Sequence, residues 1–517
     1  MNGAESLLRT AAASGIRVCF ANPGTTELPL VAAFDSDTGV RPVLCLFEGV
    51  CSGAADGYAR MSGNPAMTLL HLGPGFANGI ANFHNARRAR SAIFNVIGDH
   101  ASWHLASDPP LASDIASLAS PVSGWLRSAN PAGPLSRDAA EAIAAARSGA
   151  IATLIVPHDA QLQDGATVEV VEEPAPRQRP SSAAIEASAR LLTQAGKGAL
   201  LLGGDGLSER GLRAAARVAA ATGCTLWCDT FPARLERGGD LPAVDRVPYF
   251  PEGAIEVFSG LATVVLAGTG SPVSFFGYPG IPSQIIGERT ETATLALPNE
   301  DVGSALEDLA EAVGGAEDRP APAVSSGLET RPTGPLTPES VAAVVAGVQP
   351  EGAIVMDEGL TAARAYFSAA ANAPRHTYLS LTGGAIGQGL PCATGAALAC
   401  PDRPVIALQA DGSGMYTLQA LWTQAREGLD VTTVILANRG YQILAIELAR
   451  TGIAELGPGC RSLTDFDPVP DWTQLARGFG VPAVAVEDAE GLWRELERAL
   501  AEPGPHLIEV PIKERNP

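Results

Sequence analysis

The chain has 517 residues, of which 46% are hydrophobic and only 5% aromatic, and its formal net charge is −21. This length exceeds what one ordinary hydrophobic core accommodates, so we expect two to four domains. An acidic chain without a basic stripe argues against nucleic acid as a partner.

The cysteines and the N-terminal stretch bear on where in the cell the protein is located. The eight cysteines show no zinc-like C-x-x-C pairing, and most lie in apolar surroundings, which is typical of reduced thiols in a cytosol. The N-terminal stretch carries an early acid and begins an amphipathic helix, unlike a signal peptide. No apolar run reaches the ~18 residues that a membrane-spanning helix needs. The sequence therefore predicts a cytoplasmic protein with no membrane partner.

Two stretches rich in proline, glycine and charge, residues 164–182 and 314–340, are typical of linkers. They divide the chain into three blocks, 1–163, 183–313 and 338–517. In each block, short apolar runs alternate with helical patterns, which indicates parallel sheets covered by helices on both faces. We therefore expect an α/β protein of three doubly wound parallel-sheet domains. In such sheets, ligands bind beyond the carboxyl ends of the strands.

In the first block, two side chains suited to proton chemistry follow predicted strands. Glu48 is expected where the run "RPVLCLF" ends, next to a helix of small residues, in an apolar setting where a carboxyl can share a proton. His71 is expected at the end of "AMTLLH", beside a glycine-rich loop, which suits it to proton transfer. The alternatives are a helix-start charge for Glu48 and a half-buried structural histidine for His71.

The second block has predicted strands in "GALLLGG", "TLWCDT" and "ATVVLAG". In the third, the apolar run of "VIALQADGSG" ends in Asp411, and Asn438 follows the later run "VTTVILA". Neighbouring parallel strands would bring both oxygen side chains to one edge, where they and a backbone carbonyl suit Mg²⁺ or Ca²⁺. The backbone N–H groups of Gly412 and Ser413 could face a phosphate. The alternatives are a helix cap and a turn.

These patterns resemble those of thiamine diphosphate (ThDP) enzymes. Asp411-Gly412 with Asn438, after "GGAIGQGLP", is similar to that family's diphosphate-binding motif, and Glu48 with "AADGYARMSG" is similar to its pyrimidine-domain motif. The resemblance covers nearly the whole chain and implies a pyrimidine-binding, a central and a diphosphate-binding domain. The family's motif usually begins Gly-Asp-Gly and ends Asn-Asn, whereas this chain has Ala410 and Ala437 at the flanking positions. The effect of these two departures on cofactor affinity stays open.

The resemblance implies a role for each matched residue. Glu48 would hydrogen-bond the aminopyrimidine ring of ThDP. Ile386 would be the aliphatic wedge that bends the cofactor, with ordinary core packing as the alternative. Asp411, Asn438 and Gly440 would bind Mg²⁺ (or Ca²⁺). Gly412, Ser413 and Tyr441 would bind the cofactor.

Within the acetolactate synthase and benzoylformate decarboxylase family, the motifs look most like benzoylformate decarboxylase. "ANPGTTELPL" places Thr25 where that enzyme binds the substrate carboxylate, and His71 falls on its active-site histidine. Phe276 and Leu444 are candidate walls of the substrate pocket, with core packing as the alternative. "GSPVSFFGYPGIP" lacks the decarboxylase's second histidine, so either proton transfer would be incomplete or Tyr278 or a water would substitute for it.

Acetolactate synthases differ from this chain in two respects. They lack a histidine at the position of His71, and their central domain binds FAD. The stretch "LLLGGDGLSERG" in the central block gives only a weak glycine-rich signal, and plain strand–helix turns share that pattern. We therefore do not expect FAD.

The resemblance implies ThDP- and Mg²⁺-dependent, non-oxidative decarboxylation of a benzoylformate-like or branched 2-oxo acid to an aldehyde. The alternatives are an acetolactate synthase-like carboligase and a non-catalytic ThDP-fold protein. In the family, the cofactor lies between the first domain of one chain and the third domain of another, which implies a homodimer or homotetramer. The sequence leaves open the 2-oxo acid, any acceptor, the choice between two and four chains, and the pathway.

Overall fold

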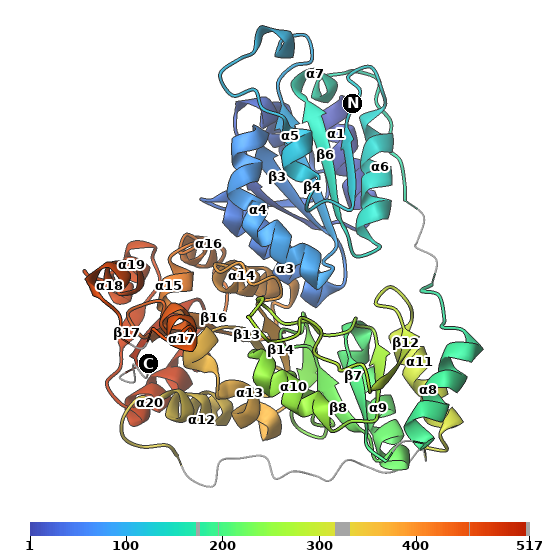
Figure 1. Ribbon diagram of the computed structural model, residues 1–517. Helices are drawn as coiled ribbons and strands as arrows, with labels where there is room; N and C mark the ends of the chain where they lie inside the picture. The colour runs from blue at the N-terminus through green and yellow to red at the C-terminus, as the bar shows by residue number, and fades with distance from the viewer. Residues whose placement is uncertain (172–175, 195, 316–330, 454, 513–517) are drawn as a thin grey trace.

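The chain folds into three α/β units, each built around its own sheet (Figure 1). The computed structural model describes residues 1–171, 176–194, 196–315, 331–453 and 455–512. Two parts of the predicted linkers, 172–175 and 316–330, lie outside the described residues. The expectation of three mostly parallel sheets is confirmed.

The first domain has a six-stranded parallel sheet of order β2-β1-β3-β4-β6-β5. Its strands are β1 (Val18–Asn22), β2 (Arg41–Leu44), β3 (Ala66–His71), β4 (Ile93–Asp99), β5 (Trp125–Ser128) and β6 (Ile151–Pro157). Its helices are α1 (Gly3–Ala13), α2 (Leu28–Ala33), α3 (Glu48–Ser62), α4 (Leu72–Ala89), α5 (Ile115–Ala119), α6 (Leu135–Ala146) and α7 (His158–Gln161). The central strands are buried along nearly their whole length, as continuous apolar runs in parallel sheets are.

The second domain has a five-stranded sheet of order β10-β8-β7-β11-β12. Its strands are β7 (Gly198–Leu202), β8 (Thr225–Cys228), β10 (Asp245–Arg246), β11 (Thr263–Ala267) and β12 (Glu291–Ala296). Its helices are α8 (Ser182–Gln194), α9 (Glu209–Thr222), α10 (Pro251–Ser259) and α11 (Val302–Ala312).

The third domain has a seven-stranded sheet of order β17-β18-β16-β15-β13-β14-β9. Its own strands are β13 (Ile354–Glu358), β14 (His376–Ser380), β15 (Val405–Ala410), β16 (Val431–Ala437), β17 (Ala483–Ala485) and β18 (His506–Pro511). Its helices are α12 (Pro338–Val348), α13 (Tyr366–Ala369), α14 (Gly389–Ala399), α15 (Asp411–Gly414), α16 (Ala420–Glu427), α17 (Gln442–Arg450), α18 (Pro458–Thr464), α19 (Trp472–Gly478) and α20 (Ala489–Ala501).

The seventh strand of that sheet comes from the central block. β9 (Leu235–Arg237) pairs antiparallel with β14, with Arg237 opposite His376 and Leu235 opposite Tyr378. It covers an edge of the sheet that would otherwise expose unpaired backbone groups. Residues 183–313 are therefore not a self-contained unit, although the division of the chain into three sheets follows the predicted blocks.

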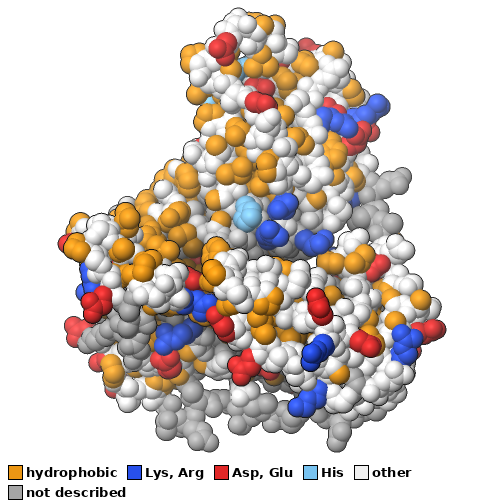
Figure 2. All heavy atoms as spheres, viewed as in Figure 1, with side chains coloured by type: hydrophobic (Ala, Val, Ile, Leu, Met, Phe, Trp, Pro, Cys, Tyr) orange, Lys and Arg blue, Asp and Glu red, His pale blue; other side chains and the backbone are white. Residues whose placement is uncertain are grey.

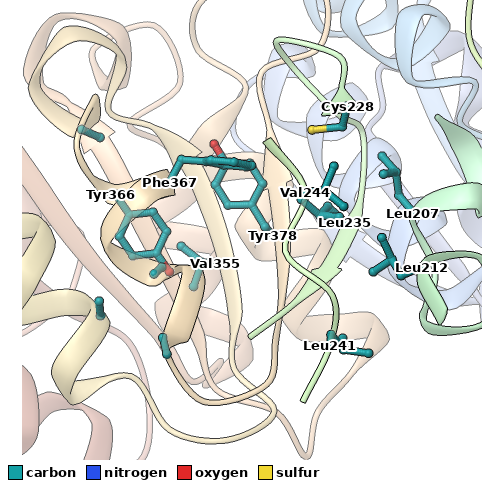
Figure 3. Close-up of a cluster of buried hydrophobic side chains, with 14 of the residues drawn as sticks. Leu207, Leu212, Cys228, Leu235, Leu241, Val244, Val355, Tyr366, Phe367 and Tyr378 are labelled. Carbon is teal, nitrogen blue, oxygen red and sulfur yellow. The ribbon is translucent and has the colours of Figure 1, made fainter. Parts of the chain in front are cut away.

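The second and third domains also share a hydrophobic core. Figure 3 shows Tyr366, Phe367 and Tyr378 of the third domain facing Cys228 and Leu235 of the central block. All five belong to one cluster of buried side chains. The two domains therefore form a common base on which the first domain rests (Figure 1).

The first domain contacts this base through α3 and α14, which approach closely because both are rich in glycine and alanine. A side chain at Gly57 would overlap with the carbonyl of Cys392, and one at Gly395 would overlap with the carbonyl of Ala54. Small residues at these positions therefore allow the two helix backbones to lie against each other. The first and third domains share a hydrophobic cluster here.

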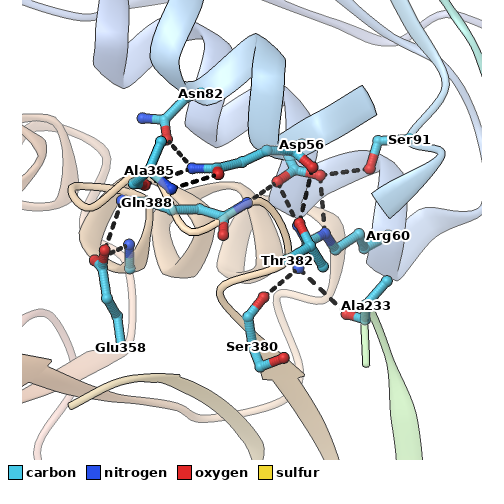
Figure 4. Close-up of polar contacts among 12 residues, drawn as sticks. Asp56, Arg60, Asn82, Ser91, Ala233, Glu358, Ser380, Thr382, Ala385 and Gln388 are labelled. Carbon is cyan, nitrogen blue, oxygen red and sulfur yellow. Dashed lines mark hydrogen bonds and ion pairs between the residues drawn. The ribbon is translucent and has the colours of Figure 1, made fainter. Parts of the chain in front are cut away.

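A buried polar network fixes the same junction (Figure 4). Arg60 donates to both carboxylate oxygens of Asp56, at 2.8 and 2.7 Å, and to the backbone carbonyl of Ser380 at 2.8 Å. Gln388 and Ser91 also donate to Asp56. Because the side chains of Asp56 and Arg60 are 0% and 2% exposed, this pair ties the first domain to the third away from water.

No helix among the described residues is both long and apolar enough to cross a membrane. Figure 2 shows hydrophobic side chains exposed over much of the first domain and the adjoining part of the third domain. The large exposed apolar side chains include Trp103, Leu105 and Leu111 of the first domain and Leu463 and Val469 of the third.

Candidate active site

The carboxyl ends of β15 and β16 bring together the two predicted metal ligands. The strands pair in parallel with Ala410 opposite Leu436, so Asp411 and Asn438 follow neighbouring strands at one edge. Their exposed fractions are 2% and 8%. The carboxylate of Asp411 accepts N–H groups from Gly412 at 2.9 Å and from Arg439 at 2.7 Å. The predicted juxtaposition is therefore present.

The donor chemistry of this edge fits the metal that the sequence implies. A carboxylate, an amide oxygen and the adjacent backbone carbonyl of Gly440 are hard oxygen donors, which Mg²⁺ and Ca²⁺ prefer. The N–H of Gly440 lies 3.3 Å from Asn438 Oδ1, so the turn after β16 holds the amide in place. Ala410 and Ala437, the two departures from the family motif, are buried strand residues that leave these donors where they are.

The residues predicted to contact the diphosphate surround the same turn. Gly412 is buried, and a side chain there would contact the rings of both Tyr441 and Phe466. Ser413 is 2% exposed, and its hydroxyl accepts from Gln409 Nε2 at 2.8 Å. Burial and a hydrogen bond to Tyr416 raise the pKa of Tyr441 to about 12. Tyr441 is therefore a neutral hydrogen-bonding group beside the sheet edge that carries Asp411 and Asn438.

A cavity of about 870 Å³ opens between the central and third domains and contains four of the predicted site residues. Asn438, Ile386, Phe276 and Leu444 all line it. Phe276 and Leu444 are 53% and 45% exposed, so they are walls of a cavity and not core residues. The cavity is mostly apolar and aromatic, further lined by Phe231, Tyr249, Phe250, Phe275 and Phe367.

Glu358, which the sequence interpretation gave no role, organises the glycine-rich segment that carries Ile386. It ends β13, is 1% exposed, and accepts backbone N–H groups from Gly387 at 2.7 Å and Gly389 at 2.6 Å. Burial raises the pKa of its carboxyl, whereas these donors lower it. An acid at the end of a buried strand was the available signal, but its partners lie about thirty residues away.

Glu48 lies slightly off its expected position. It is the first residue of α3 and not the last of a strand, since β2 already ends at Leu44. Its carboxylate accepts from Asn78 Nδ2 at 3.0 Å, and Gly75 leaves room for it. A half-buried carboxylate at a helix start, with one amide donor, can bind a basic ring nitrogen.

His71 is the last residue of β3, as predicted. Its Nδ1 lies 2.8 Å from Glu27 Oε2 and 3.2 Å from Thr26 Oγ1. Thr25, the predicted substrate contact, is exposed, and the neighbouring Thr26 touches the histidine. Sequence reasoning missed Glu27 because an acid in "TTEL" looks like an ordinary first-turn helix charge.

Within one chain, Asn82 links the two parts of the candidate site: its Nδ2 donates to the carbonyl of Gly49, next to Glu48, at 2.8 Å and to that of Gly387, next to Ile386, at 3.1 Å. The residues that line the cavity all come from position 227 onward, so Glu48 and His71 are not among them. Tyr278, considered as a substitute for a second histidine, does not line the cavity either. Its hydroxyl donates to Glu447 Oε1 at 2.9 Å, and burial raises its pKa.

Comparisons with known proteins agree with this arrangement. Residues 1–116 match the family "Thiamine pyrophosphate enzyme, N-terminal TPP binding domain", and residues 359–510 match "Thiamine pyrophosphate enzyme, C-terminal TPP binding domain". Both cofactor-binding domains of this family are therefore recognised in the chain. The chain belongs to the thiamine pyrophosphate enzymes.

Its relatives include both decarboxylases and acetolactate synthases. The chain is 49% identical, over 99% of both chains, to "Putative acetolactate synthase large subunit IlvX" of Mycobacterium tuberculosis. It is 30% identical, over 97% of both chains, to benzoylformate decarboxylase of Pseudomonas aeruginosa. Among solved structures, the ThDP-dependent 4-hydroxybenzoylformate decarboxylase of Rhodococcus jostii RHA1 matches with a TM-score of 0.85 and 26% identity over 100% of both chains.

Proposed function

We propose that this protein catalyses the ThDP- and Mg²⁺-dependent, non-oxidative decarboxylation of a benzoylformate-like or branched 2-oxo acid to an aldehyde. The observation that carries the proposal is the position of His71, whose ring lies at the same sheet edge as Glu48. Gly75 separates the two side chains: a Cβ there would lie 3.1 Å from Glu48 Oε1 and 3.5 Å from His71 Cβ. A histidine so close to the proposed cofactor-binding carboxylate can deliver the proton that the aldehyde product requires.

Each remaining residue has a role in this proposal. When bound, ThDP supplies the electron sink that accepts the carbanion electrons left by CO₂. Glu48 binds the aminopyrimidine ring and holds a proton there, and Thr25 binds the substrate carboxylate. Asp411, Asn438 and Gly440 hold Mg²⁺. Gly412, Ser413 and Tyr441 bind the diphosphate end, Ile386 supports the bent cofactor, and Phe276 and Leu444 enclose the substrate side chain.

The proposal includes an active site shared between two chains. Glu48 and His71 are not among the residues that line the cavity with Asn438 and Ile386. Exposed apolar side chains on the first and third domains support a homodimer or homotetramer whose active sites lie at the chain interface. A cytoplasmic location completes the proposal.

A second candidate is an acetolactate synthase-like carboligase, in which a second carbonyl compound and not a proton captures the carbanion. The mycobacterial relative's name favours it. A cavity of about 870 Å³ also has room for an acceptor.

One assay separates these candidates. Purified protein with ThDP and Mg²⁺ is incubated with pyruvate, branched 2-oxo acids or benzoylformate, and CO₂ and carbon products are recorded together. We expect an aldehyde, absent in Glu48→Gln and formed about 10²-fold or more slowly in His71→Ala. His104→Ala, at an exposed position of the same domain, is the control. A hydroxy ketone whose formation ignores His71→Ala would favour the carboligase, and no turnover at all would reject both substrate classes.

A further inference from the structure

Glu27 is a buried acid at the carboxyl edge of the first sheet. It is the last residue of the short 3₁₀ helix Thr25–Glu27 that follows β1, and its side chain is 0% exposed. Its carboxylate accepts the backbone N–H of Gly24 at 2.7 Å and the hydroxyl of Thr26. The ring of His71 lies on the same carboxylate, with Nδ1 2.8 Å from Oε2.

The contact with His71 determines which ring nitrogen carries the proton. Glu27 Oε2 accepts from Gly24 and Oε1 accepts from Thr26, so both oxygens act as acceptors and we assign Nδ1, 2.8 Å from Oε2, as the donor. Thr26 gives its own hydroxyl proton to Glu27, and its oxygen is 3.2 Å from the same Nδ1. In the neutral ring, Nε2 is then the acceptor. The His71 side chain is 23% exposed, so the ring reaches the surface where substrate would arrive.

The backbone around the pair is shaped to admit it. His71 pairs with Gly98 of β4, and a side chain at Gly98 would overlap with Glu27 Oε1. A side chain at Gly24 would overlap with the His71 ring. Any other residue at these two glycines would push the carboxylate and the imidazole apart. The turn after β1 and strand β4 therefore each have a glycine beside the acid–histidine contact.

We propose that Glu27 is a positioning residue that fixes His71 with its proton on Nδ1 and stabilises the imidazolium formed whenever Nε2 takes a proton. This inference rests on the proposed role of His71 in proton transfer. No atom is gained or lost overall, because the proton taken at Nε2 returns from Nε2 to the substrate carbon. Carboxylates behind catalytic histidines act in this way in other enzymes.

Other charged or titratable groups face the pair and provide controls. Asp99 ends β4 next to Gly98, and burial raises the pKa of its carboxyl, with Glu27 contributing to that rise. His158 Nδ1 lies 3.1 Å from the carbonyl of Thr26. Glu48 faces His71 across Gly75. Asp99→Asn removes a neighbouring charge without touching His71 and is the matched control for Glu27→Gln.

The first test reads the proton directly. The full-length protein, labelled with ¹⁵N-histidine and supplied with ThDP and Mg²⁺, is studied by NMR at a pH where His71 is neutral, and the spectrum of His71→Asn assigns its signals. We expect the Nδ1–H form of His71 in the wild type and in Asp99→Asn, and a loss of that preference in Glu27→Gln. A wild-type His71 with its proton on Nε2 would overturn the inference, whether or not any variant folds.

The second test measures turnover. We expect Glu27→Gln to lower kcat about 10–100-fold with little change in KM, the range of loss seen when a carboxylate that orients a metal-binding histidine is removed. Glu27→Gln also removes the carboxylate charge that faces the imidazole ring. Glu27→Asp, which keeps that charge, should recover part of kcat.

The outcomes separate this inference from the proposed function. Loss of aldehyde formation in His71→Ala, with Glu27→Gln equal to Asp99→Asn, would overturn the role of Glu27 alone. Unchanged turnover in His71→Ala would overturn the role of His71 as well, and with it the premise of the inference.

Discussion

The carboxylate of Asp411 accepts the backbone N–H of Arg439 at 2.7 Å, which joins the turn after β15 to the turn after β16. The same turn carries Asn438, so this hydrogen bond sets the spacing of the two proposed metal ligands before any metal binds. The site is thus largely formed by the sheet itself, and metal binding need not order a loop.

We expect Asp411→Asn to weaken Mg²⁺-dependent ThDP binding at least about 10-fold, because the variant loses the only charged donor of the proposed set. Isothermal calorimetry with ThDP, with and without Mg²⁺, measures the effect. Asp430→Asn is the matched control: Asp430 precedes β16 at the opposite edge of the sheet and accepts the N–H of Gly504. Equal binding by the two variants would contradict the assignment.

Mixing two inactive variants tests the division of the site between chains. Glu48→Gln and Asp411→Asn should each be inactive alone. If Glu48 of one chain serves Asp411 of another, hybrid oligomers contain one site with both residues intact, and mixing after mild dissociation should restore part of the activity. A mixture that stays inactive, although hybrids form in native mass spectrometry, would place both residues of each site in the same chain.

Phe276→Ala should change substrate preference more than stability, because its side chain is 53% exposed and lines the cavity. We expect kcat/KM for an aromatic 2-oxo acid to fall about 10–200-fold relative to pyruvate, the range for a lost hydrophobic contact. Val273→Ala is a fitting control, since Val273 is 60% exposed and lies outside the cavity lining. Parallel losses for both substrates would argue against a pocket role.

Asp56→Ala should destabilise the fold by roughly 3–5 kcal/mol, because it leaves the buried guanidinium of Arg60 without its counter-charge. Thermal unfolding followed by circular dichroism shows this as a clear fall in Tm. By contrast, Glu339→Ala removes the partner of an exposed ion pair with Arg364 and should change stability by less than about 0.5 kcal/mol. Similar Tm values for the two variants would mean that the junction is not held by this pair.

Stability should also depend on pH through Asp229. Burial raises the pKa of this carboxyl from 3.8 to about 6, although Thr269 donates to it. The folded chain holds this proton more tightly than the unfolded chain does. The protonated carboxyl therefore contributes to the free energy of unfolding, fully below pH 3.8, and this contribution is lost as the pH rises through about 6. As the pH rises between these two values, the free energy of unfolding of Asp229→Asn should increase by roughly 3 kcal/mol relative to that of the wild type. A Tm difference that stays constant from about pH 4.5 to 7 would contradict this.

The sequence was sufficient for the parts of the fold that depend on local pattern. Buried parallel strands are continuous apolar runs, so β1, β3, β15 and β16 could be recognised, and the residues after β15 and β16 could be placed at one edge. β9 could not be recognised, since three residues with two charged side chains form a strand only because an edge of the third sheet is available.

The same distinction applies to the site. His71 could be placed at a strand end because it follows an apolar run. Its contact with Glu27 was not visible, since the two residues are 44 positions apart and meet only through the pairing of β1 with β3. Glu358 was missed for a similar reason: its partners Gly387 and Gly389 are backbone groups, which carry no residue signature.

β9 also limits which domains can be exchanged between this protein and another one. Because the central block supplies the last strand of the third sheet, a chimera that imported another protein's central domain would have to import a strand matching His376–Ser380 as well. An insertion or exchange that ignored this would leave an open edge ready to pair with other chains. The central domain is therefore joined to the third domain through a shared sheet and cannot be exchanged as an independent module.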